Sequence, residues 1–142
     1  MIYAFVKRLM DVILSLGALV ALSGVLPGLA LLIKLDSPGP ILFRQRRIGR
    51  GKRIFVLYKF RTMRADAPAD TATHLLSDPA RHITRLGAWL RRTSLDELPQ
   101  LYNILRGDMS LVGPRPALWN QDDLVAERDR HGANDLRPGL TG

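Results

Sequence analysis

Two adjacent carboxylates, Asp96 and Glu97, lie in the stretch RRTSLDELPQLYNIL. A carboxylate can attack phosphorus as a nucleophile, and paired acids can share a divalent ion such as Mg²⁺ that bridges substrate phosphates. Arg91 precedes the pair, and Arg115 follows it between two prolines in the stretch GPRP. Guanidinium groups bind phosphate oxygens in a bidentate manner. These residue types indicate phosphoryl chemistry on an anionic substrate.

The same acids also have a purely structural interpretation. Ser94 and Glu97 fit a capping box, with Ser94 as the N-cap and Glu97 at the N3 position of a helix. Pro99 would then stand at the fifth helical position, where it removes a backbone hydrogen bond and bends the helix. GPRP is likewise typical of a structural turn. A helix-spaced apolar stripe follows the acids: Leu95, Leu98, Tyr102 and Leu105.

Composition limits the classes of protein that could carry such a site. The 142 residues are 46% hydrophobic, which suffices for one modest folded core. The formal charge of +8 indicates an anionic partner, which could be nucleic acid, acidic lipid or a phosphorylated small molecule. The absence of cysteine excludes disulfides and thiolate chemistry.

A long apolar segment near the N-terminus predicts insertion into a membrane. No charged side chain occurs from Val12 to Ile33, about 22 residues, which as a straight helix would be roughly 33 Å long. A chain this small has little interior for a helix that is apolar all round. Both flanks are basic, with Lys7 and Arg8 before the segment and Lys34 after it. The positive-inside tendency therefore favours both ends on one side of the bilayer.

The stretch LSGVLPG supplies a way for the segment to enter the membrane, bend and return. Pro27 removes a backbone donor, Gly24 weakens the helix, and Ser23 can hydrogen-bond a freed carbonyl. We therefore predict a re-entrant membrane helix that bends at Ser23, Gly24 and Pro27. A kinked helix that spans the bilayer remains the alternative.

A cationic segment follows the turn DSPGP. ILFRQRRIG and KRIFVLYKFRTM read as two strands around Gly49 to Gly51, which predicts a small β-hairpin. Between Ser37 and Ala65 there is no acid, and such a block suits anionic lipid headgroups beside an inserted helix. No nucleic-acid reading motif accompanies it, so we expect no nucleic-acid partner. Nine cations form the block: Arg44, Arg46, Arg47, Arg50, Lys52, Arg53, Lys59, Arg61 and Arg64.

The predicted architecture is a mixed, helix-rich α/β fold. A re-entrant membrane segment occupies residues 1–36, and a catalytic domain with the hairpin and interfacial amphipathic helices around the acids occupies residues 37–142. The polar stretch from Ala65 to Ala80 is expected to be a surface loop with a helical turn at His74 to Leu76.

Several long motifs, in order, carry a resemblance to a known family. KRLMDVIL, KLDSPGPILFRQRRIGRGKRIFVLYKFRTM, TRLGAWLRRTSLDELPQLYNILRGDMSLVGPRP and RPGLTG resemble the bacterial sugar transferases over nearly the whole chain. These are monotopic phosphoglycosyl transferases that start exopolysaccharide, lipopolysaccharide O-antigen and glycoprotein glycan assembly. The resemblance implies transfer of a phosphosugar from a nucleoside-diphosphate sugar, usually a UDP-sugar, to polyprenyl phosphate. The products are UMP and a polyprenyl-diphosphate sugar.

Carried over by motif, the resemblance assigns roles to individual residues. Asp96 is the nucleophile that becomes a covalent phosphosugar carrier, and Glu97 is its partner in binding Mg²⁺ or handling a proton. Arg91 and Arg115 match arginines that contact phosphate or nucleotide, and Lys59 and Arg61 are weaker candidates for the same contacts.

The resemblance also implies a location and partners. The chain is expected at the bacterial inner membrane with its catalytic part on the cytoplasmic face, in contact with lipid, polyprenyl phosphate and the sugar donor. Whether it is a monomer or a homo-oligomer is left open. A Ser-Pro pair usually marks the family's helix break, whereas here Gly24 follows Ser23. Family chains also continue beyond PGLTG, so ending at Gly142 leads us to expect a truncated or an unusually short member.

One hypothesis from another class remains. The chain could be a noncatalytic, membrane-anchored basic protein whose hairpin binds anionic lipid or polymer and whose acids only cap a helix. Loss of sugar transfer in Asp96→Asn would distinguish the two.

Overall fold

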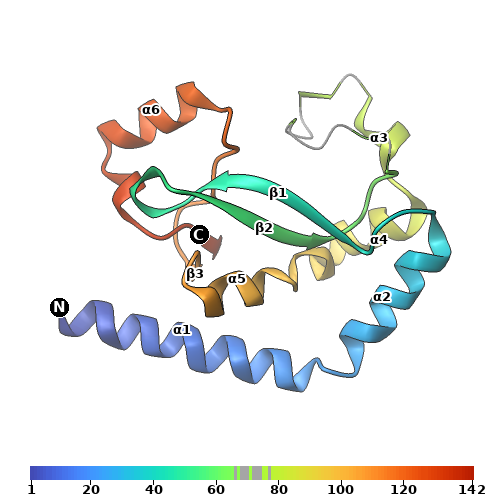
Figure 1. Cartoon of the computed structure of the whole chain (residues 1–142), viewed down its shortest axis with the longest axis horizontal. Coiled ribbons are helices and arrows are strands. Elements are labelled where there is room, and N and C mark those ends of the chain that lie inside the picture. Colours follow the sequence, from blue (N-terminus) through green and yellow to red (C-terminus); the bar gives the residue numbers. More distant parts are fainter. Residues whose placement is uncertain (66, 68–70, 72–74, 77) are drawn as a thin grey trace.

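The computed structural model of the chain describes residues 1–65, 67, 71, 75–76 and 78–142 (Figure 1). Half of the predicted loop from Ala65 to Ala80 lies outside this part, and so does His74 of its predicted turn. Within the described part the fold is helix-rich, with a central two-stranded hairpin. The mixed α/β class predicted from the sequence is confirmed.

The N-terminal segment is a bent pair of helices. α1 (Ile2–Ala21) and α2 (Val25–Asp36) meet at an angle of 66° across a short break. Ser23 and Gly24 lie in this break, whereas Pro27 lies in the first turn of α2, where a missing N–H is tolerated. The bend therefore precedes the proline, and Pro27 opens the second helix rather than breaking the first.

The two helices have the apolar character of a membrane-inserted segment only when they are taken together. Among the described residues, no single helix is long and apolar enough to cross a bilayer, but the bent pair meets that requirement by length and composition. Large apolar side chains are exposed along it: Phe5, Leu9, Ile13, Leu16, Val20, Leu31 and Leu32. Exposed apolar surface of this kind marks an interaction surface.

The inner side of α1 is bound to the rest of the chain by polar contacts. Asp11 is buried and accepts hydrogen bonds from Ser110 Oγ (2.7 Å) and Leu111 N (3.2 Å). Arg8 donates to the carbonyls of Ile104 (2.5 Å) and Leu105 (2.9 Å). These carbonyls lie in the last turn of α5 (Gln100–Arg106), where a cation is favoured by the helix dipole. α1 therefore runs alongside α5, as Figure 1 shows.

The predicted hairpin is confirmed. β1 (Leu42–Ile48) and β2 (Ile54–Phe60) are antiparallel, from Leu42 opposite Phe60 to Ile48 opposite Ile54. The 3-10 turn η1 (Arg50–Lys52) joins them. Gly51 has φ 66°, a left-handed conformation that glycine adopts without strain.

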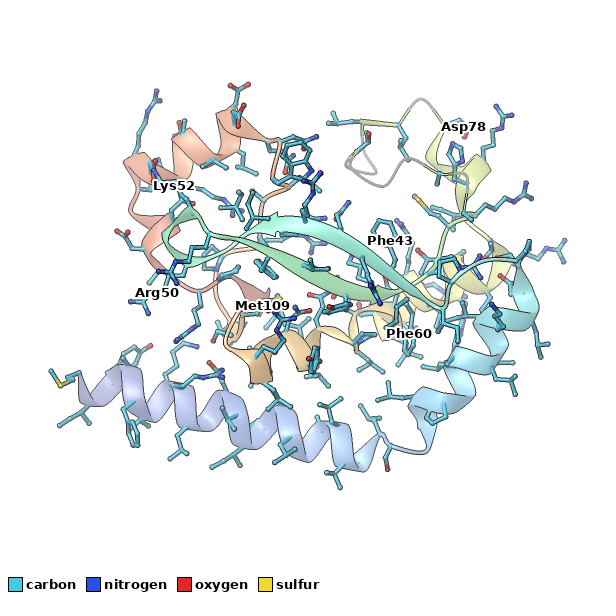
Figure 2. All side chains as sticks on the ribbon, in the orientation of Figure 1. Phe43, Arg50, Lys52, Phe60, Asp78 and Met109 are labelled. Carbon is cyan, nitrogen blue, oxygen red and sulfur yellow. The ribbon has the colours of Figure 1, made fainter. Side chains whose placement is uncertain are left out.

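Two hydrophobic cores lie at opposite ends of β2. The first packs Phe55 and Leu57 against α5 (Gln100–Arg106) and Met109. The second packs Phe60 against α2 and against Leu90 of α4 (Arg85–Thr93). Figure 2 labels Phe60 at the α2 end of the hairpin and Met109 below the hairpin's other part. Helices α4 and α5 are thereby fixed below the same strand.

The remaining elements cover the end of the hairpin that lies away from α2. β3 pairs with β4 in parallel, and α6 lies beside the turn of the hairpin (Figure 1). Their bounds are β3 (Ser110–Val112), α6 (Asp122–Arg130), η4 (Ala133–Asp135) and β4 (Gly139–Thr141), and the short α3 (Pro79–His82) precedes α4.

The apolar stripe predicted after the acids is confirmed at Leu95 and Leu98, which pack against the second core, and is wrong at Tyr102. Tyr102 is 51% exposed, and the inward side chains of α5 belong to Leu101, Asn103 and Ile104. The reason is that the helix is interrupted after Glu97, so the periodicity counted from Leu95 does not continue through α5.

Candidate active site

The acid pair occupies a single 3-10 turn, η3 (Leu95–Glu97), between α4 and α5. Ser94 has φ 59°, a left-handed conformation that ends α4 and reverses the chain. Its hydroxyl accepts no capping hydrogen bond from the described residues, so the predicted capping box is wrong. Pro99 precedes α5 as its N-cap, where no N–H is required. The acids therefore lie in a sharp connection between two helices.

Asp96 is a buried acid among cations. The residue is only 6% exposed. Burial raises the pKa of Asp96, and the negative charge of Glu97 adds to this, while Lys59 and Arg91 act in the opposite direction. An ionised carboxylate here is poorly hydrated, which favours its use as a nucleophile.

Lys59 reaches the acids from β2. Its Nζ lies 3.9 Å from Glu97 Oε1. Burial lowers the pKa of Lys59, and the charges of Asp96 and Glu97 partly restore it. Lys59 is in phase along β2 with the buried Phe55 and Leu57. A lysine on the inner face of a strand needs a charged partner, which the acids supply.

Arg91 is held beside Asp96 by the end of the hairpin. Arg91 Nε donates a hydrogen bond of 2.8 Å to Thr62 Oγ1. Burial lowers the pKa of Arg91, and the charge of Asp96 opposes this. One edge of the guanidinium is thus fixed, which orients the remaining donors.

Arg115 completes the arrangement from the GPRP loop. Its Nη2 lies 3.7 Å from Glu97 Oε1, and its side chain is 72% exposed. An ion pair this exposed contributes about 1 kcal/mol or less to stability, so its geometry matters more than its energy. Arg115 is available to a ligand in a way that a buried arginine is not.

The GPRP loop is fixed from both sides. Gly113 N donates to Thr141 O (3.0 Å) and Gly139 N donates to Pro114 O (2.8 Å). A Cβ on Gly139 would meet Gly113 N at 2.1 Å, so this approach requires glycine. On the other side, Arg47 Nη1 donates to Pro116 O (2.9 Å). The backbone that carries Arg115 is therefore rigid, as the two prolines indicate.

A cleft of about 530 Å³ contains the acids and five cations. Its charged lining residues are Asp96, Glu97, Lys59, Arg47, Arg91, Arg115 and Arg128. The excess of positive charge suits a ligand with several negative charges, such as a diphosphate. A second cavity of about 700 Å³ shares Arg47, Lys59 and Arg91 with the cleft and extends along β1 toward the end of α2.

The residues predicted from sequence reach different places. Asp96, Glu97, Lys59, Arg91 and Arg115 all line the cleft. Arg61 does not. It is 6% exposed and its guanidinium donates to the turn after α2, with Pro40 O (2.6 Å), Pro38 O (2.7 Å) and Ser37 O (2.7 Å) as acceptors. Arg61 lines the second cavity instead. Its donors are engaged by backbone carbonyls and by Ser37 Oγ, which gives it a structural role in the turn after α2.

Two cleft residues were missed. Arg47 was counted only as one cation of the basic block, although it occurs in phase with the inward Gln45 of β1. The two-residue period of the strand could therefore have identified Arg47 as an inward residue from the sequence. Arg128 lies on α6, for which the sequence offered no motif, and only the packing of α6 brings it to the cleft.

The acid pair suits Mg²⁺ when a phosphate ligand completes the coordination of the ion. Within the described residues, no group of three or more His, Asp or Glu side chains could hold a metal ion. The pair offers two carboxylates at most. Mg²⁺ is commonly held by one or two carboxylates, water and substrate phosphates. The donor set thus suits Mg²⁺ that arrives with, or is completed by, a phosphate ligand.

Comparison with known proteins adds a consistent set of similarities. The profile of the family described as bacterial sugar transferase matches residues 2–142. A UDP-N-acetylgalactosamine-undecaprenyl-phosphate N-acetylgalactosaminephosphotransferase of Aeromonas hydrophila is 42% identical over 99% of this chain and 34% of its own length. An undecaprenyl-phosphate glucose phosphotransferase of Komagataeibacter xylinus is 51% identical over 96% of this chain and 26% of its own length.

A third relative is closer to this chain in length. An exopolysaccharide production protein of Rhizobium leguminosarum bv. phaseoli is 47% identical over 96% of this chain and 70% of its own length. The chain thus spans about a third of the Aeromonas relative and most of the Rhizobium one.

Proposed function

The chain belongs to the bacterial sugar transferase family, and from this premise we propose that it transfers a phosphosugar from a nucleoside-diphosphate sugar to polyprenyl phosphate. The observation that carries the proposal is the position of Asp96, a buried carboxylate in a cleft with five cations. The cations suit a diphosphate donor, and the carboxylate suits attack on phosphorus.

The proposed first step forms a covalent intermediate. An Oδ of Asp96 attacks the sugar-bearing phosphorus of the donor. The bond between this phosphorus and the bridging oxygen breaks, and the nucleoside monophosphate leaves with the bridging oxygen and its electron pair. Asp96 then carries the phosphosugar as an acyl phosphate. The raised pKa of Asp96 means that the site must supply cations to keep it ionised, and Lys59 and Arg91 do so.

In the second step an oxygen of polyprenyl phosphate attacks the same phosphorus. The acyl phosphate bond breaks and the Asp96 carboxylate is regenerated, while the lipid leaves as the diphosphate sugar. The second cavity supports a separate approach for the lipid phosphate, because it shares Arg91 and Lys59 with the cleft and has Ile41 and Met63 in its lining.

The remaining site residues have supporting roles in this proposal. Arg91 and Lys59 bind oxygens of the phosphate under attack, and Arg115 binds the donor's diphosphate. Glu97 and Asp96 would hold Mg²⁺. When bound, the ion would neutralise phosphate charge and raise the electrophilicity of phosphorus. Glu97 also holds Arg115 and Lys59 toward the acids through its ion pairs.

We place the chain at the bacterial inner membrane, with the cleft on the cytoplasmic side. The bent, outwardly apolar helix pair supports a re-entrant insertion, since it exposes apolar side chains along both helices. A site at the membrane surface reaches both a soluble nucleotide and a lipid phosphate.

The test is release of UMP by the chain in lipid nanodiscs with Mg²⁺ and polyprenyl phosphate. UDP-N-acetylgalactosamine and UDP-glucose are the first donors to try, because relatives are named for these sugars. Release from either donor, dependent on Asp96, supports the proposal. A chain that releases UMP from no donor in a UDP-sugar panel would contradict it.

A further inference from the structure

Three guanidinium groups gather at one end of the cleft. Arg47 comes from β1, Arg115 from the GPRP loop and Arg128 from α6, and all three line the same 530 Å³ space. Their proximity shows in Arg47, whose pKa falls to about 10 through burial and through the positive charges of Arg115 and Arg128. We call these three residues the arginine cluster.

The cluster has little negative charge of its own. Arg47 donates to neutral acceptors, Gln45 Oε1 (2.8 Å) and Pro116 O (2.9 Å). Arg115 has Glu97 at 3.7 Å, but Glu97 is shared with Lys59. The Arg128 side chain is half-buried and has no hydrogen bond or ion pair with the described residues. Like charges brought together at a cost in free energy indicate a site completed by an anion.

The other cations of the cleft lie elsewhere along it. Arg91 is tied to Thr62 Oγ1 (2.8 Å) and acts on the charge of Asp96. Arg115 instead reaches Glu97 Oε1 (3.7 Å), and with Arg47 and Glu97 it lines a small pocket that neither Arg91 nor Asp96 lines. Lys59 lies between the two groups, since it interacts with both acids and also with Arg47 and Arg115. The acids therefore stand between Arg91 on one side and the arginine cluster on the other.

This order matches the two phosphates of a diphosphate. On the basis of the proposed function, we propose that the donor lies in one direction only, with its sugar-bearing phosphate at Asp96 and Arg91 and its nucleotide phosphate in the arginine cluster. Arg128 is then a binding residue for the nucleoside monophosphate that leaves.

The direction has a chemical reason. When the bond from phosphorus to the bridging oxygen breaks, the bridging oxygen keeps the electron pair and the leaving phosphate gains negative charge. Guanidinium groups around that phosphate bind it more strongly after the cleavage than before, which stabilises the leaving group. The sugar-bearing phosphate, which Arg91 and Lys59 bind, gains no net charge in this step.

The test measures binding of UMP to the chain in nanodiscs by equilibrium dialysis, for wild type, Arg128→Gln and Arg130→Gln. Arg130 is the matched control, because it lies on the same helix and pairs with Glu127 (3.1 Å) outside the cleft. Arg128→Gln should weaken UMP binding about 10-fold, as loss of a charge-assisted contact does. Arg130→Gln should change it less than about 2-fold, and neither variant should alter binding of uridine.

Turnover supplies a second measurement. In Arg128→Gln the KM for the sugar donor should rise, and inhibition by UMP should weaken in parallel, while the KM for polyprenyl phosphate stays unchanged. Arg128→Lys keeps the charge and should show a smaller loss, which separates the charge from a folding defect.

Any of three results would overturn the inference. The first is UMP binding by Arg128→Gln at wild-type strength, and the second is no UMP binding by wild type. The third is an Arg128→Gln defect confined to polyprenyl phosphate, which would assign the cluster to the acceptor. The proposed function fails separately, when wild type that binds UMP transfers no phosphosugar.

Discussion

Arg91 Nε donates a 2.8 Å hydrogen bond to Thr62 Oγ1, and this contact joins the helix before the acid pair to the end of the hairpin. The two segments are also in very close backbone contact, since a Cβ on Gly87 would meet Thr62 O at 2.0 Å. The position of Arg91 beside Asp96 is thus set by the segment that follows β2 as much as by α4.

Thr62→Val should therefore reduce activity without removing any group that touches substrate. Valine has nearly the shape of threonine but cannot accept from Arg91 Nε, so we expect kcat/KM to fall about 5- to 10-fold and stability to fall by about 1 kcal/mol. Thr93→Val is the matched control, because among the described residues the Thr93 hydroxyl bonds only its own helix, at Trp89 O and Leu90 O. Equal kinetics in the two variants would refute a positioning role for Thr62.

Removal of Arg61 should affect folding rather than chemistry. Arg61→Ala takes away the donors to Pro38 O, Pro40 O and Ser37 O and leaves a cavity where the buried Arg61 side chain packed. We expect the free energy of unfolding to fall by about 3 kcal/mol or more. Thermal unfolding of the purified chain measures this, with the exposed Arg64→Ala as control. A variant with wild-type stability and weak donor binding would instead restore Arg61 to the site.

The acid limb of the pH profile should report on Asp96. Because burial raises the pKa of Asp96, with Glu97 adding to the rise against Lys59 and Arg91, the nucleophile protonates at a higher pH than an ordinary aspartate. Burst release of UMP should fall as the pH falls through this raised value. A burst that persists unchanged down to about pH 4, the ordinary range of aspartate, would contradict the account.

The same shift predicts the sign of a stability effect. Asp96 binds its proton more tightly in the folded chain, so its contribution favours folding at low pH and is lost as the pH rises through the folded pKa. The unfolding temperature of Asp96→Asn relative to wild type should therefore increase from about pH 4 to about pH 7. A decrease over that range would show that the cations outweigh the burial.

The topology of α1 and α2 can be tested with single cysteines, because the chain has none. In a re-entrant arrangement, Tyr3→Cys and Asp36→Cys both react with an impermeant maleimide from the cytoplasmic side of inverted vesicles, and Val20→Cys is protected. In a spanning helix, Tyr3→Cys and Asp36→Cys react from opposite sides, which would refute re-entrance.

Local patterns predicted the elements that depend on local rules. The alternation of apolar and charged residues around Gly49 to Gly51 predicted the hairpin, since strand periodicity and turn chemistry act over a few residues. The helix-weakening stretch around Ser23 and Gly24 predicted the break between α1 and α2. The acid pair was found because two adjacent carboxylates interrupt a leucine-rich stretch, and Arg115 because it stands between two prolines.

Tertiary contacts decided what the sequence could not show. Lys59 and Arg61 are two residues apart in the same motif. Arg61 binds the turn after α2, whereas Lys59 reaches the acids. Ser94 looked like a helix start, yet the chain reverses there because α4 and α5 pack below the same strand. Arg128 reaches the cleft only through the placement of α6.

The covalent step is the centre of the proposal, and mass spectrometry of Asp96 tests it most directly. Wild type in nanodiscs, given Mg²⁺ and a UDP-sugar that it accepts but no polyprenyl phosphate, should release about one UMP per chain and gain the mass of one phosphosugar on the peptide that contains Asp96. Polyprenyl phosphate should then remove the adduct, and Asp96→Asn should show neither burst nor adduct. Normal turnover by Asp96→Asn, or an adduct on another residue, would contradict the assignment of Asp96 as the nucleophile.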